Sequence, residues 1–334
     1  MNAARAVRWL TVPAVALTLL LIATGLAQST GLAVSTPPLP EAQGQSFAVK
    51  LGGTLAATGV TGADILGAGG MVLIPCGTLG LVCTDPASGA KDEFGGLSFG
   101  EDFSPSDLPP VQFSVSSGGQ GLPGTAVYAE SHCAVPEPQA DVFGTAPDGS
   151  NAQVLDGNGL ACASGAGLGL GLNESAGGED LVAIEEDPCH TVDANCDGMP
   201  EGMIFFTLAP GSLSLDFYGV TPRDILVSLG GMPVVVWATG SADLGLRAGD
   251  VIDALCVREN GDALLSLGDR LLISLAQGSP TLAALNAGSG DLLKVNPPRA
   301  LFTAAVFGLE RSDDVDALRC NFELKNRYLA RIQR

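Results

Sequence analysis

The sequence predicts an all-β protein made of four internal repeats, and we expect these repeats to form a small β-propeller. Three observations lead to this fold class. Similar blocks of residues recur four times in the same order. Each repeat holds short runs of Val, Ile, Phe and Leu separated by Gly, Pro, Asn and Asp, and helical periodicity is weak. A β-sandwich pair and a stacked β-solenoid are the alternatives, because a repeat does not by itself show how its sheets close.

The first repeated block is clearest in two copies, FTLAPGSLSL at residues 206–215 and ISLAQGSPTL at residues 273–282. Looser copies occupy residues 113–122 and 47–55. Each copy starts with an apolar run and continues into a glycine-containing turn. The block therefore predicts a strand followed by a turn in every unit.

A second block, with the pattern L-x3-G-V-T-x2-D-I-L, occupies residues 55–66 and 215–226. The other two units keep only its end, as DLL at residues 291–293 and DVF at residues 141–143. The DVF copy is displaced by an insertion around His132. The second unit therefore carries a segment that the others lack.

A third block closes each unit, and its best copies are DVIDAL at residues 250–255 and DDVDAL at residues 313–318. Looser copies lie at residues 179–184 and 92–97. The acids of this block favour turn capping, and they would bind a cation only if their carboxylates converged. The blocks divide the chain into units of about residues 46–101, 111–187, 203–258 and 270–320.

The third unit illustrates the strands that we expect, which are Met203–Leu208, Asp224–Ser228, Pro233–Ala238 and Val251–Val257. Three or four short strands in a unit of about 50 residues are typical of a propeller blade.

The N-terminal segment has the pattern of a secretory signal peptide. Arg5 and Arg8 precede an apolar run, and small residues occupy Gly25 and Ala27. We expect cleavage after Ala27, with an uncleaved membrane anchor as the alternative. Residues 1–27 would then be the signal peptide, residues 28–45 a flexible lead-in, residues 46–320 the repeat domain and residues 321–334 a basic tail. This organisation predicts a secreted or cell-envelope protein with no membrane span after cleavage.

The charge balance argues against one class of partner and favours another. The chain has 36 acidic and 16 basic residues, for a formal net charge of −20. Nucleic-acid binding needs a basic surface, so we expect none. A strongly acidic exported protein stays soluble and attracts divalent cations.

Eight cysteines in an exported chain predict disulfide bonds. Spacing alone does not fix their pairing, and a zinc site is the rival interpretation. Short spacing favours Cys76–Cys83 and Cys189–Cys196, and the remaining cysteines suggest Cys133–Cys162 and Cys256–Cys320.

The segment at residues 193–201 (DANCDGMPE) predicts a calcium-binding loop. Oxygen-bearing side chains alternate along it, and a glycine at its sixth position permits the sharp turn that lets them converge. Ca²⁺ prefers six to eight oxygen ligands, which a tight loop can supply. The candidate ligands are Asp193, Asn195, Asp197, the backbone carbonyl of Met199, and Glu201.

This loop resembles the calcium hairpin loops of integrin-α-type (FG-GAP) propeller blades, because D-x-N-x-D-G-x-x-E leads directly into a strand-like run. It differs from them in Glu201, where they have Asp, and in Cys196 at the fourth position. The tandem blocks are similar to those of exported bacterial repeat proteins of unassigned role. Both resemblances imply a β-propeller-like fold, and the first implies Ca²⁺ as the cofactor.

We find no motif that assigns a catalytic residue. His132 and His190 each adjoin a cysteine that we expect to be oxidised, and a Cys–His nucleophile needs a free thiol. The sequence favours an exported, non-catalytic repeat protein, stabilised by calcium and disulfides, that binds a glycan or protein at the cell surface. The alternatives are an extracellular polysaccharide hydrolase or lyase that uses acidic residues, and a structural envelope component.

Overall fold

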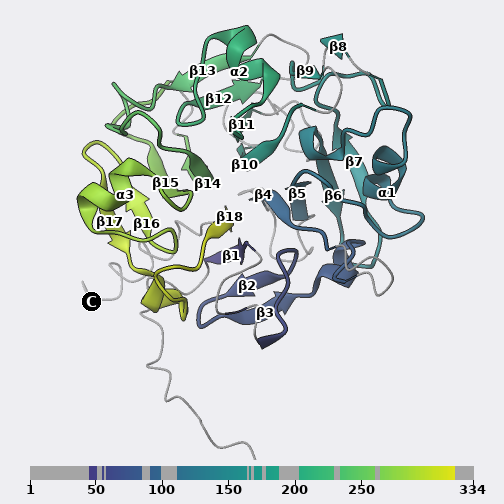
Figure 1. Ribbon diagram of the computed structural model, residues 1–334, viewed down its shortest axis with the longest axis horizontal. Coiled ribbons are helices and arrows are strands. Elements are labelled where there is room, and N and C mark those ends of the chain that lie inside the picture. The colour runs from purple at the N-terminus through teal and green to yellow at the C-terminus, as the bar shows by residue number, and fades with distance from the viewer. Residues whose placement is uncertain are drawn as a thin grey trace, which may run out of the picture. The chain divides into compact units, whose positions relative to one another are not determined.

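The computed structural model confirms the predicted all-β fold as a four-bladed β-propeller (Figure 1). Four antiparallel, four-stranded sheets surround a common centre, and β4, β10, β14 and β18 are the innermost strands. The structure describes residues 45–50, 55, 58–84, 91–98, 111–163, 165–166, 169–174, 178–187, 203–228, 234–259 and 264–319.

Each blade has four strands, which follow one another from the inner to the outer edge. Blade 1 contains β18 (Val315–Arg319), β1 (Ser46–Val49), β2 (Ile65–Gly67) and β3 (Met71–Ile74). Blade 2 contains β4 (Phe94–Ser98), β5 (Val111–Val115), β6 (Val142–Thr145) and β7 (Ala152–Leu155). Blade 3 contains β10 (Leu181–Asp187), β11 (Met203–Leu208), β12 (Ile225–Ser228) and β13 (Val235–Ala238). Blade 4 contains β14 (Ile252–Arg258), β15 (Arg270–Leu275), β16 (Leu292–Lys294) and β17 (Arg299–Phe302).

Short helices and one hairpin complete the fold. A helix of six residues follows the second strand of blades 2, 3 and 4: α1 (Ala126–Ser131), α2 (Leu213–Tyr218) and α3 (Pro280–Leu285). The 3₁₀ helices are η3 (Cys76–Leu79), η4 (Pro138–Ala140) and η5 (Ala304–Phe307). The hairpin of β8 (Gly165–Ala166) and β9 (Asn173–Glu174) follows blade 2. No helix among the described residues is both long and apolar enough to cross a membrane.

The blades are offset by one strand from the sequence repeats. The third block of each repeat forms the innermost strand of the next blade, so that β4, from the first repeat, belongs to blade 2. In blade 1, the inner strand β18 comes from the last repeat and pairs with β1, with Phe47 opposite Leu318. The two ends of the repeat domain therefore close the ring within one sheet.

All four inner strands carry a β-bulge at the same place in the third block. The extra residue is the fourth of the block in every blade: Gly95, Val182, Asp253 and Asp316. A bulge redirects the side chain of the extra residue. The extra residue is therefore redirected relative to its neighbours on the strand in all four blades.

Buried hydroxyl groups join neighbouring blades next to these bulges. Ser114 of blade 2 donates to the Leu181 carbonyl of blade 3 at 3.1 Å. Thr207 donates to the Ile252 carbonyl at 3.2 Å, and Ser274 donates to the Val315 carbonyl at 2.7 Å. Blade 1 has Ala48 at this position, which has no hydroxyl. The second residue of the first block thus holds one blade to the next in three of the four positions.

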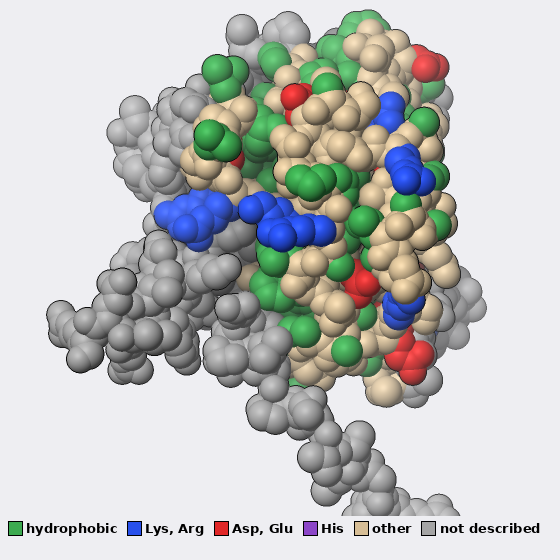
Figure 2. Space-filling model, turned by 90° about the vertical axis from the view of Figure 1, so that its left-hand side faces the viewer, with side chains coloured by type: hydrophobic (Ala, Val, Ile, Leu, Met, Phe, Trp, Pro, Cys, Tyr) green, Lys and Arg blue, Asp and Glu red, His purple; other side chains and the backbone are tan. Residues whose placement is uncertain are grey.

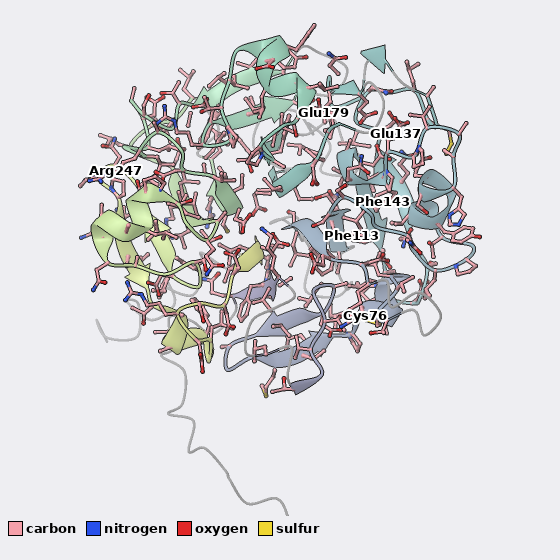
Figure 3. All side chains as sticks on the ribbon, in the orientation of Figure 1. Cys76, Phe113, Glu137, Phe143, Glu179 and Arg247 are labelled. Atoms are coloured by element: carbon pink, nitrogen blue, oxygen red, sulfur yellow. A yellow bond between two sulfur atoms is a disulfide. The ribbon has the colours of Figure 1, made fainter. Side chains whose placement is uncertain are left out.

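Apolar side chains of the strands fill the space between adjacent blades in four buried clusters. Phe113 and Phe143 of blade 2, labelled in Figure 3, lie with ring centroids 5.9 Å apart. The strands predicted for the third unit are confirmed to within two residues. Runs of apolar residues therefore suffice to locate the strands of this unit, although the outermost strand of each blade is largely exposed or half-buried.

The surface charge is not uniform despite the acidic composition. Figure 2 shows Lys and Arg side chains gathered on the side of the molecule that carries β17 and α3. On the β14–β15 pair, Arg258 lies directly opposite Arg270, and on the β16–β17 pair, Lys294 lies opposite Arg299. Blade 4 therefore carries basic residues on all four strands.

Candidate functional site

The turn after β5 is the first wall of a pocket in blade 2. Its backbone is held by Asp92, whose Oδ1 accepts from the N–H of Gln120 at 2.7 Å and whose Oδ2 accepts from the N–H of Gly121 at 3.0 Å. Gly118 has a φ of +91°, which L side chains rarely adopt. The turn thus presents a glycine backbone and two polar side chains in a fixed position.

The end of α1 forms the second wall. The Ser131 hydroxyl donates to the carbonyl of Gln120 at 2.9 Å, which ties the helix to the turn. The His132 ring stacks on Tyr128 with centroids 3.9 Å apart, and its Nδ1 lies 2.9 Å from the Tyr128 carbonyl oxygen. The Ser131 hydroxyl oxygen also lies 2.9 Å from Nδ1, and Nε2 is the second hydrogen-bonding atom of the ring. His132 is exposed.

The insertion of the second repeat forms the third wall, and a disulfide fastens it. Cys133 is bonded to Cys162, as predicted, and Cys76–Cys83 is confirmed as well. Both sulfur atoms lie close to Glu130 Oε2, at 3.6 and 3.7 Å. This trio has the spacing of metal ligands, but an oxidised sulfur is not a thiolate ligand. The disulfide of this trio is therefore a covalent anchor for the insertion.

The pocket between these walls has a volume of about 390 Å³. Its lining consists of amides, hydroxyls, an imidazole, glycine backbone and two proline rings, and it includes no carboxylate, ammonium or guanidinium group of the described residues. Such a pocket offers hydrogen bonds and small apolar faces to an uncharged polar ligand. The lining residues are Ser117, Gly118, Gly119, Gln120, Ser131, His132, Pro136, Pro138 and Gln139.

The first acid of the third block caps turns, as the sequence favoured. Asp92, Asp250 and Asp313 each accept from the backbone N–H of a residue upstream, at distances of 2.7, 2.6 and 2.8 Å. Asp250 also accepts from the Thr281 N–H at the start of α3, at 2.8 Å. These carboxylates are occupied by backbone donors and serve the fold.

At the fourth position of the block, the last two repeats have an acid where the first two have Gly95 and Val182. Asp253 and Asp316, both at bulges, converge on the Nζ of Lys50, which lies 2.8 Å from Asp253 Oδ1 and 2.9 Å from Asp316 Oδ1. The backbone N–H of Lys50 donates to the Asp314 carbonyl at 3.0 Å and so fixes the lysine beside β18. These carboxylates therefore do converge on a cation, and that cation belongs to the chain itself.

Lys50, Asp253 and Asp180 all have pKa values shifted by burial and by one another's charges. Burial disfavours the charged lysine, yet the carboxylates of Asp316 and Asp253 raise the pKa of Lys50 above its usual value. Burial raises the pKa of Asp253 to about 6, against the opposing effect of Lys50. Burial likewise raises the pKa of Asp180 to about 7. Asp253 and Asp316 are 1% exposed, whereas the Lys50 side chain is 36% exposed and covers them from the solvent side. The group serves the closure of the ring.

The predicted calcium ligands Asp193, Asn195, Asp197, Met199 and Glu201 lie outside the described residues, as do Cys189 and Cys196. The signal peptide, residues 28–44 of the lead-in and the basic tail lie outside them too. Cys256 is disulfide-bonded, and its predicted partner, Cys320, is not among the described residues. These predictions remain predictions.

Sequence reasoning did not find the pocket. Its lining residues are ordinary turn formers, and they share no spacing that points to a ligand. The available indication was the insertion around His132, which breaks the repeat in one unit only. Comparison with protein-family models, with curated proteins and with solved structures found no match.

Proposed function

We propose that this protein is an exported, non-catalytic binding protein that holds a saccharide unit in the pocket of blade 2. The observation that carries the proposal is the uncharged, polar lining of this pocket. Saccharides present many hydroxyl groups and small apolar C–H faces. The lining offers hydrogen-bonding side chains to the hydroxyls and proline rings to the C–H faces, in a volume typical of small-molecule sites.

The chemistry of the lining also argues for binding without turnover. Cleavage of a glycosidic bond generally needs two carboxyl groups that flank it. The described lining contains neither Asp nor Glu. The neighbouring Cys133 is oxidised and so offers no thiol nucleophile. A ligand in this pocket would meet hydrogen-bond partners and no acid–base pair.

Calcium at Asp193–Glu201 and the disulfides complete the proposal as stabilising elements. Divalent cation binding at this loop would stiffen the connection between β10 and β11. The double variant Asp193→Ala with Asp197→Ala should lower the melting temperature only when calcium is present. An equal loss in chelator would count against these residues as calcium ligands.

A glycan array probed with the chain from residue 28 onward tests the saccharide proposal. Gln120 is exposed at the pocket, and Gln120→Ala should weaken binding to a positive glycan about fivefold, because one neutral hydrogen bond is worth roughly 1 kcal/mol. Gln277→Ala is the matched control, since Gln277 is an exposed glutamine in the corresponding turn of the last repeat, outside the pocket lining. No binding to any glycan by the folded chain, or equal binding by both variants, would refute the proposal.

A further inference from the structure

Behind the pocket wall, blade 2 buries a group of carboxyl groups, here called the blade 2 carboxyl cluster: Glu130, Glu137, Asp141, Asp156 and Glu174. Glu137, Asp141 and Glu174 are at most 1% exposed. Figure 3 shows Glu137 in the outer part of the blade, between α1 and the β8–β9 hairpin. The neighbouring charges that raise the pKa values of Glu130, Glu137, Asp141 and Glu174 all belong to other carboxyl groups.

Two members of the cluster are well supplied with hydrogen-bond donors. Asp141 accepts from the Gly157 N–H at 3.0 Å and from Gln153 Nε2 at 2.9 Å. Asp156 Oδ1 accepts from the N–H groups of Asn158 and Leu160 at 3.1 and 2.9 Å. These bonds satisfy one side of the cluster.

Glu174 and Glu137 differ from the others, because buried oxygens of both lack donors. Neither Oε1 nor Oε2 of Glu174 has a hydrogen-bond partner, and neither has Oε2 of Glu137. Glu137 Oε1 accepts from the Ala163 N–H at 3.1 Å. The two carboxyl groups contact each other, but two ionised carboxylates cannot hydrogen-bond to each other. A shared proton, a bridging water or a cation has to join them.

The backbone leaves space for these oxygens at Gly157. A Cβ on this residue would lie 1.8 Å from Glu174 Oε1 and 2.8 Å from the Ala140 carbonyl oxygen. The Glu174 carboxylate therefore lies against bare backbone, with a carbonyl oxygen nearby. Carboxylate and carbonyl oxygens without donors are the ligand types that Ca²⁺ prefers.

We propose that Glu174 and Glu137, with the carbonyl oxygen of Ala140 nearby, form a calcium site that fixes the insertion behind the pocket. A divalent cation would supply the positive charge that the cluster lacks and would bond to the oxygens that no donor reaches. The site uses none of the residues of the loop at 193–201, and it does not depend on saccharide binding.

Protonation is the competing way to stabilise the cluster. Burial, with the charges of Asp141 and Glu137, raises the pKa of Glu174 to about 10 when no cation is present. A cation on the same oxygens would displace that proton, so calcium uptake near pH 8 should release protons. The two explanations therefore differ in measurable calcium affinity and proton release.

The test uses the chain from residue 28 onward with the substitutions Asp193→Ala and Asp197→Ala, which remove the predicted loop site. This double variant is the parent protein of the experiment, and CaCl₂ is the probe. Calorimetric titration near pH 8, in buffers of different ionisation enthalpy, measures calcium binding and proton release together. The parent should bind calcium, and adding Glu174→Gln should weaken that binding at least tenfold, because a ligand charge is lost. Saturating calcium should raise the melting temperature of the parent by about 4 °C but not that of the Glu174→Gln variant.

Glu179→Gln is the matched control, since Glu179 is a 1% exposed carboxylate outside the cluster that accepts from the Ser214 N–H. It should leave calcium affinity unchanged, and Glu137→Gln replaces the Glu174 variant if the latter does not fold. Absence of calcium binding by the folded parent would overturn the proposal and leave the shared proton as the explanation. Equal calcium binding by the parent and the Glu174→Gln variant would overturn it as well. Either result leaves the saccharide proposal intact, because the glycan array reports on that proposal separately.

Discussion

Lys50 and Asp253 are 203 residues apart in the sequence, yet the Nζ of Lys50 lies 2.8 and 2.9 Å from the two carboxylate oxygens of Asp253. Lys50 directly follows β1 of blade 1, and Asp253 lies in the inner strand of blade 4. The same ammonium group reaches Asp316 on β18. One lysine thus joins the N-terminal strand, the C-terminal strand and the neighbouring blade at the place where the ring closes.

The first prediction concerns this lysine. Lys50→Met should destabilise the fold by about 2 kcal/mol near pH 8, because Asp253 and Asp316 would lose their counter-ion while buried. For a chain of this size that corresponds to a fall in melting temperature of about 3 °C. The fall should be smaller near pH 5, where carboxyl groups with raised pKa values take up protons and need no counter-ion. Thermal unfolding at both pH values measures the difference, and an equal fall at both would contradict this role.

The hydroxyl bonds between blades give the second prediction. Ser274→Ala removes a buried bond to the Val315 carbonyl and should cost about 1–2 kcal/mol, or about 2 °C in melting temperature. Ser241→Ala, at an exposed serine of blade 3, serves as the control and should change stability little. Thr207→Val tests the equivalent bond between blades 3 and 4 at nearly constant side-chain volume. If neither interblade variant differs from the control, the hydroxyls contribute nothing to ring stability.

The third prediction concerns the disulfide of the insertion. Cys133 and Cys162 are 29 residues apart, and closing a loop of that length restricts the unfolded chain by about 3.5 kcal/mol. The double variant Cys133→Ala with Cys162→Ala should therefore lower the melting temperature by about 6 °C. It should also make residues 132–163 the first segment that a protease cleaves.

The control for this variant is Cys76→Ala with Cys83→Ala, which opens the other described disulfide in blade 1. It should lower stability without increasing cleavage in residues 132–163. Increased cleavage there in both double variants would mean that the insertion is not held locally by its own disulfide.

Much of the fold could be predicted from the sequence because the repeat encodes it locally. The run Met203–Leu208 is β11 as expected, since its apolar pattern needs no distant partner to be recognised. The disulfide Cys76–Cys83 followed from short spacing, and Cys133–Cys162 was suggested by the cysteines that remained. The pairing of Lys50 with Asp253 could not be predicted, because it depends on a bulge and on ring closure.

The candidate sites show the same contrast between features encoded by neighbouring residues and features that depend on ring closure and distant segments. A calcium loop at residues 193–201 can be predicted because its candidate ligands are close together in sequence, and it stays a prediction because it lies outside the described residues. The blade 2 pocket was not recognisable, since three separate segments form it. Glu137 and Glu174 lie 37 positions apart by residue number, and no spacing rule brings them together. Local chemistry can thus be read from one sequence, whereas convergence depends on the fold.

The last prediction concerns the pH dependence of stability without calcium. Several buried carboxyl groups have pKa values raised by burial, to about 10 for Glu174 and about 7 for Glu179 and Asp180. An acid whose pKa is higher in the folded state keeps a proton that the unfolded chain releases as the pH rises above about 4.5. The unfolding free energy should therefore fall as the pH rises from about 5 to about 8, and the contribution of Glu174 continues to be lost toward its folded pKa.

Denaturant unfolding in chelator across this range measures the effect. Within the blade 2 carboxyl cluster, Glu174→Gln cannot ionise, so it should flatten the pH dependence by up to about 1.4 kcal/mol per pH unit. Calcium should also flatten it, because a cation on the Glu174 oxygens would favour the ionised form that the unfolded chain already has at neutral pH. Stability that rises between about pH 5 and 8 in chelator would show that these carboxyl groups are ionised in the folded protein, with partners other than protons.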